Sequence, residues 1–164
     1  MRWDKDTLTF SYSDNRYYAN ARQAAREWTD LGTGISIVPA PSGQTGDLVF
    51  DDVHFPKATW AAQAEVPPEW AGAHSFVPTS PHVPSVVHIW VDLDKTGVLD
   101  DAHMTYAMAH EIGHALGLAH SDSCKIYDPS IMLSGGSDVP TRLIITPQYY
   151  DKIELEELYS LPRG

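Results

Sequence analysis

Apolar residues recur with two different periods along the chain, and each period predicts a different element. Near the start, from Thr7 to Tyr12, apolar and polar residues alternate, which is typical of a strand with one buried face. Tyr18, Ala21 and Ala25 follow a spacing of three to four residues, which predicts an amphipathic helix. Together these patterns predict strands at 7–12, 35–38, 47–50, 73–77 and 86–91, and helices at 15–30, 101–116 and 147–158.

The order of these elements predicts an α+β fold around a mixed, twisted sheet. Because a helix separates the first two strands, those strands are expected to pair in parallel. Prolines flank the strand at 73–77, so this strand is expected at an edge of the sheet. Thr146 is expected to cap the last helix, with Pro147 in its first position. The length suits a single domain over residues 1–164, and a monomer is expected.

The chain is acidic and contains a single cysteine. Its formal net charge of −11 argues against nucleic acid and anionic membranes as partners. It contains no apolar run of about 18 residues, so no transmembrane helix is expected, and residues 1–6 lack the apolar core of a signal peptide. Cys124 has no second cysteine to pair with, so no internal disulfide is expected.

The eleven residues from His110 to His120 have the spacing of a zinc site. On a helix, His110 and His114 lie on one face a turn apart and can bind one metal together, while Glu111 points beside that metal. Gly117 can adopt the positive φ that ends a helix, so that His120 returns as a third ligand. Three protein ligands leave the fourth position open to water, which is typical of a catalytic zinc.

The pattern His-Glu-x-x-His-x-x-Gly-x-x-His resembles that of the metzincin metallopeptidases. Met132 is similar in position to the methionine of the metzincin Met-turn, and glycines follow it. Ser121 after the third histidine resembles the matrixins, whereas the segment around Met132 resembles the small bacterial snapalysins. The resemblance implies a metzincin fold with one antiparallel edge strand, an active-site helix, a Met-turn and a C-terminal helix. It also implies lobes of about 1–119 and 120–164, and secretion.

The pattern and the resemblance together predict a zinc-dependent endopeptidase. Zinc is expected to activate a water molecule and polarise the scissile carbonyl, with Glu111 as the general base. Peptide or protein would be the substrate. One alternative is a zinc-binding module without turnover. Another is an effector protease with a single target.

Two segments are expected to form the substrate cleft. An extended peptide can add to an edge strand by main-chain pairing, and the favoured cradle is 71–77, with Ala73, His74, Ser75 and Phe76 as the contacting residues. If the family pattern holds, residues 133–146 form the wall of the main specificity pocket.

Two further metal sites are possible. His74 and His88 lie in segments that resemble those which give one histidine each to the structural zinc of matrixins, and His54 could complete the site. Pro56, however, occupies the position of an aspartate ligand, and ordinary polar residues on strands and loops are the alternative. Asp92 and Asp94 alternate as in a calcium loop, although the rest of that pattern is missing and a solvated acidic turn is the alternative.

Overall fold

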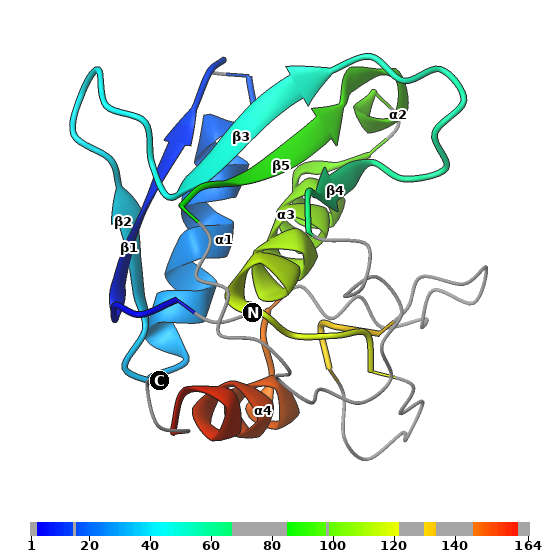
Figure 1. Cartoon of the computed structure of the whole chain (residues 1–164). Helices are drawn as coiled ribbons and strands as arrows, with labels where there is room; N and C mark the ends of the chain where they lie inside the picture. Colours follow the sequence, from blue (N-terminus) through cyan, green and yellow to red (C-terminus); the bar gives the residue numbers. More distant parts are fainter. Residues whose placement is uncertain are drawn as a thin grey trace.

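A five-stranded sheet and two long helices packed against one of its faces form most of the described structure (Figure 1). The computed structural model describes residues 3–14, 16–66, 85–97, 99–121, 130–133 and 146–160. The strands are β1 (Thr7–Tyr12), β2 (Ser36–Pro39), β3 (Leu48–Val53), β4 (Ala62–Ala64) and β5 (Val87–Asp92). The helices are α1 (Tyr18–Asp30), α2 (Leu93–Thr96), α3 (Asp101–Leu116) and α4 (Tyr149–Ser160).

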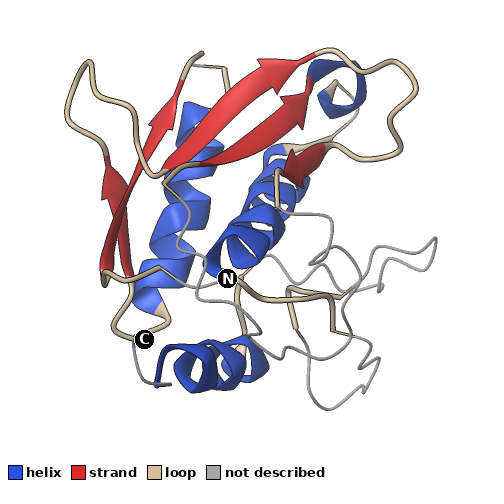
Figure 2. Cartoon of the chain, viewed as in Figure 1, coloured by secondary structure: helices blue, strands red, loops and turns tan. Residues whose placement is uncertain are grey.

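The sheet is mixed, with the strand order β2-β1-β3-β5-β4. The first four of these strands are mutually parallel, whereas β4 at the edge runs antiparallel to β5, with Ala62 opposite Val91 and Ala64 opposite Ile89. Helices α1 and α3 lie side by side beneath the sheet, and α4 lies beyond their ends (Figure 2). The predicted α+β fold with an antiparallel edge strand is therefore confirmed.

Two buried tryptophans attach α3 to the rest of the core. Trp28 on α1 is fully buried, and its indole N–H donates to the main-chain carbonyl of Ala109 on α3 at 2.8 Å. Trp3, which precedes β1, donates in the same way to Ala115 at 2.9 Å. Each bond satisfies a polar group that burial would otherwise leave without a partner, so α3 is held at two points along its length.

The elements with strong local signals begin and end where they were predicted. β1 matches the predicted strand at 7–12, and α3 matches the predicted helix at 101–116. The Asp100 side chain caps α3 by accepting the main-chain N–H of His103 at 2.9 Å. Met104 and Met108 on α3 are buried, as the apolar spacing required.

Two helix starts were predicted too early. The α1 helix begins at Tyr18, after a turn in which the Asp14 side chain accepts the main-chain N–H of Arg16 at 3.2 Å. The prediction of Thr146 as the cap of α4 is wrong, since the helix begins at Tyr149 and Gln148 precedes it. Asp151 accepts the main-chain N–H of Gln148 at 2.6 Å, which is the bond by which an acid in the first turn closes a helix start.

The pattern did not predict β4 or α2, which are three and four residues long. The predicted edge strand at 73–77, with Ala73, His74, Ser75 and Phe76, lies outside the described residues, and so does most of the predicted pocket wall. In the described part of the chain, no helix combines the length and apolarity needed to cross a membrane.

Candidate active site

The end of α3 turns the chain so that three histidines converge. Gly117 has a φ of 106°, which a residue with a side chain rarely adopts. Its N–H donates to the carbonyl of His114 at 2.9 Å, and the N–H of Leu118 donates to Gly113 at 3.0 Å. These paired bonds form the Schellman helix end, and the chain then reverses to bring His120 back toward α3.

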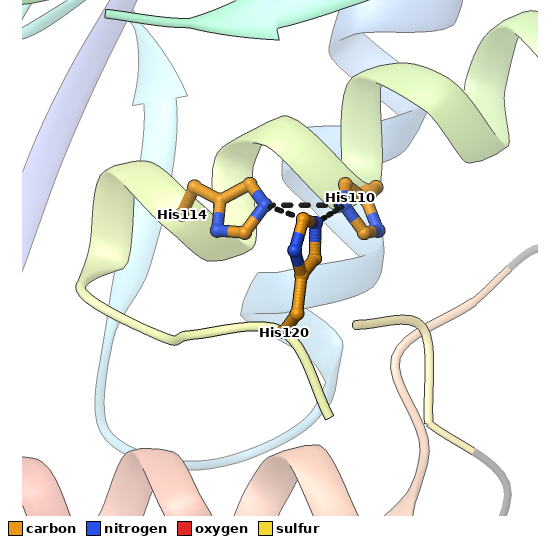
Figure 3. Close-up of side chains that lie close together, drawn as sticks. All are labelled: His110, His114 and His120. Atoms are coloured by element: carbon orange, nitrogen blue, oxygen red, sulfur yellow. Dashed lines mark hydrogen bonds between the residues drawn. The ribbon is translucent and has the colours of Figure 1, made fainter. Parts of the chain in front are cut away.

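The three imidazoles point at one another from α3 and from the segment that follows it (Figure 3). The Nε2 atoms of His110, His114 and His120 form a triangle with sides of 3.1 Å. Ligands about 2.0–2.1 Å from a tetrahedral zinc lie about 3.3 Å from one another, so the triangle fits this ion. Across the described residues, no other group of three His, Cys, Asp or Glu side chains gathers in this way.

Main-chain carbonyls orient two of these rings. His110 donates from Nδ1 to the carbonyl of Ile131 at 2.7 Å, and His114 donates from Nδ1 to that of Leu118 at 2.9 Å. A carbonyl can only accept, so the hydrogen is on Nδ1 and the Nε2 lone pair is available for a metal.

Burial also keeps these rings uncharged at neutral pH. It lowers the pKa of His110 to about 3 and that of His114 to about 4, with smaller contributions from the neighbouring histidines. A cation entering the site at neutral pH therefore meets neutral nitrogens and does not have to displace protons from these two rings.

Glu111 lies beside the histidine cluster and is held by the edge strand. Its Oε2 accepts the main-chain N–H of Ala64 on β4 at 2.7 Å. Burial raises the pKa of the Glu111 carboxyl to about 8, while the Ala64 N–H acts in the opposite direction. A carboxyl group with a pKa near neutrality is suited to accepting and returning a proton.

Met132 packs against Gly113 of α3, next to His114 in the chain. Its side chain is fully buried, and a Cβ placed on Gly113 would lie 2.3 Å from its sulfur atom. The same Cβ would lie 2.9 Å from the Trp28 ring. The helix can approach the methionine this closely only because position 113 has no side chain.

The residues predicted to bind further metals are engaged in other contacts. His54 Nδ1 lies 3.0 Å from Asp94, and His88 Nδ1 lies 2.6 Å from Asp51. Asp92 Oδ1 accepts the main-chain N–H of Asp94 at 3.0 Å and caps α2, while its buried Oδ2 has no partner within the described ranges. His74 lies outside those ranges. The second zinc and the calcium stay predictions.

Metal stoichiometry tests these further sites directly. We expect elemental analysis of the protein, after saturation with zinc and removal of the excess, to give one equivalent of zinc per chain, because only one described cluster has three convergent ligands. A second equivalent that disappears in a His88→Ala variant would instead establish the site of His54, His74 and His88.

The sequence analysis missed four groups at the site. The main-chain N–H of Ala64 and the carbonyls of Leu118 and Ile131 have no signal in the sequence, since nearly every residue carries such groups. The fourth group is the Asp151 side chain, which is fully buried. An acid in the first turn of a helix is usually exposed and is favoured there by the helix dipole, so the sequence alone gives no sign that Asp151 is buried.

Comparison with known proteins adds one finding. The sequence model of one family, described as Matrixin, matches residues 2–159, which is nearly the whole chain. No curated protein matches the chain.

Proposed function

Since the chain belongs to the matrixin family, we propose that it is a zinc-dependent endopeptidase that cleaves extended segments of protein substrates, with Glu111 as general base. The family itself implies a metalloendopeptidase acting on protein. The observation that carries the proposal is the triangle of three Nε2 atoms at 3.1 Å beside a buried carboxyl group. Matrixins are typically extracellular, and we place this protein outside the cell as well.

In the proposed reaction, the metal activates the carbonyl and the water, and Glu111 transfers the proton. Zinc held by the three histidines would polarise the scissile carbonyl and lower the pKa of a bound water molecule. The carboxylate of Glu111 uses Oε2 to accept the Ala64 N–H, and the described residues donate no other hydrogen bond to it. Oε1 is therefore the atom that would take a proton from the attacking water and later return it to the leaving amine.

The edge strand β4 is the proposed cradle for the substrate. The N–H of Glu65 donates to His88 on β5 at 2.7 Å, and Ala61 accepts from Asp92 at 2.9 Å. Main-chain groups alternate in direction along a strand, so Gln63, opposite Trp90, also faces β5, whereas Ala62 and Ala64 face the open edge. An extended peptide could pair with Ala62 while Ala64, two residues further along, holds Glu111. The cradle predicted at 71–77 lies outside the described residues and stays a prediction.

Peptide hydrolysis with controlled zinc loading tests the proposed function. We expect the purified chain to cleave casein and an internally quenched peptide, to lose this activity with a zinc chelator, and to regain it with added zinc. Cleavage of one protein only, in a cell lysate, would indicate an effector protease. Zinc binding without cleavage of any substrate would instead indicate a binding module and contradict the proposal.

A further inference from the structure

A buried carboxylate on α4 holds the segment that faces the histidine cluster. Asp151 is fully buried, and the Ser130 hydroxyl donates to its Oδ1. Its Oδ2 accepts the main-chain N–H of Ile131 at 3.1 Å and that of Gln148 at 2.6 Å. Burial raises the pKa of this carboxyl group, and the hydrogen bonds act in the opposite direction. A carboxyl group removed from water is tolerated only where donors replace the water, and here three do so.

The segment that Asp151 holds, residues 130–133, contacts both parts of the chain that carry the histidines. The carbonyl of Ile131 accepts from His110 Nδ1 at 2.7 Å. The carbonyl of Met132 accepts the main-chain N–H of Ser121 at 2.8 Å, directly after His120. The main chain of Ile131 therefore links Asp151 to His110, because its N–H donates to Asp151 and its carbonyl accepts from His110.

We propose that Asp151 is a positioning residue for the metal centre, which acts through the 130–133 segment to fix the ring of His110 and the main chain beside His120. The inference rests on the proposed zinc site. Groups that orient the ligands of a metal, without touching it, contribute to affinity because they fix the ligand nitrogens before the ion arrives. Without Asp151, the 130–133 segment would lose two of the bonds that hold it against the cluster.

The bond to Gln148 has a different consequence from the other two. It closes the start of α4 and accounts for an aspartate in the first turn of that helix. The bonds to Ser130 and Ile131 leave the helix and contribute nothing to its start. An experiment must therefore separate a loss of metal positioning from a loss of helix stability.

Measuring zinc affinity separates a loss of metal positioning from a loss of helix stability. The affinity is measured without substrate, by competition with a chromophoric chelator. We expect Asp151→Ala to bind zinc about 10- to 100-fold more weakly than the unmodified chain. The control is Leu158→Ala, which removes a buried apolar side chain from the same helix and should lower the melting temperature. The hydrogen bonds given above for residues 130–133 come from Asp151, His110 and Ser121 and do not use the Leu158 side chain, so zinc affinity in the folded control should stay within about threefold. Glu157→Gln, at an exposed position of α4, controls for the change of charge.

A second variant covers the case in which Asp151→Ala does not fold. Asp151→Asn keeps the side-chain volume, and the Ser130 hydroxyl can turn to accept a hydrogen bond from the new amide, so this variant should fold. Its zinc affinity should be at least about threefold lower than that of the unmodified chain. The visible absorption of its cobalt(II) form, which reports ligand geometry, should also differ from that of the unmodified chain.

The outcomes distinguish this proposal from the proposed function. Wild-type affinity and an unchanged cobalt spectrum in the folded Asp151 variants would overturn the positioning role and leave the peptidase proposal intact. Equal weakening in Leu158→Ala would also overturn it, because the effect would then be general. An unmodified chain that binds no zinc would overturn both.

Discussion

Replacing Glu111 by alanine is expected to lower kcat/KM for a quenched peptide by about 10²- to 10⁴-fold, the range found when a general acid–base group is removed. The zinc content should not change, because the three Nε2 atoms that form the cluster belong to His110, His114 and His120. The Ala64 N–H would lose its acceptor, but it lies on an edge strand where water can replace the carboxylate.

The comparison requires kinetics and metal analysis on the same preparations. Glu157→Ala removes a carboxylate from an exposed position on α4, and it should retain the activity and zinc content of the unmodified chain. If Glu111→Ala cleaves the peptide at the unmodified rate, the assignment of the general base is wrong. If it loses zinc as well as activity, Glu111 has a structural role.

Gly113→Ala is expected to destabilise the protein by about 1–3 kcal/mol, the usual cost of an extra methyl group in a packed core. At an exposed position inside a helix, the same substitution would stabilise by about 1 kcal/mol. The sign reverses because the new Cβ would lie 2.3 Å from the Met132 sulfur and 2.9 Å from the Trp28 ring. Either the methionine or α3 must move, so zinc affinity should fall too.

Gly97 provides the matched control. It follows α2 with a φ of −63°, which alanine adopts readily, and a Cβ placed there would meet nothing within 4 Å. Urea unfolding of the metal-free proteins should therefore show Gly97→Ala at or slightly above the stability of the unmodified chain. Equal urea midpoints for the two variants would mean that the core accommodates a methyl group at position 113 without strain.

The sequence was most informative where a signal is local. The alternation in β1 and the acid that caps α3 act within a few residues, and both elements have the predicted bounds. The three-histidine cluster was also predictable, because a helix and one glycine determine where its ligands lie. The subfamily was left between matrixin and snapalysin, and the match over residues 2–159 assigns the chain to the matrixins.

The parts that could not be predicted depend on tertiary contacts. β4 is too short to show a period, and it is a strand because it pairs with β5. Asp151 has the sequence position of an exposed first-turn acid, and its burial depends on where α4 packs. The start of α4 was misplaced for a related reason, since Asp151 and not Thr146 accepts the N–H that begins it.

The two carbonyls that orient the histidines have different origins along the chain, and this difference limits how the site can be reused in protein design. Leu118 lies inside the stretch from His110 to His120, so a graft of those residues onto another helix would carry the acceptor of His114 with it. Ile131 lies outside the stretch, so the graft would leave His110 without its acceptor. The motif is therefore only partly portable, and a host scaffold must supply a carbonyl for His110 from its own backbone.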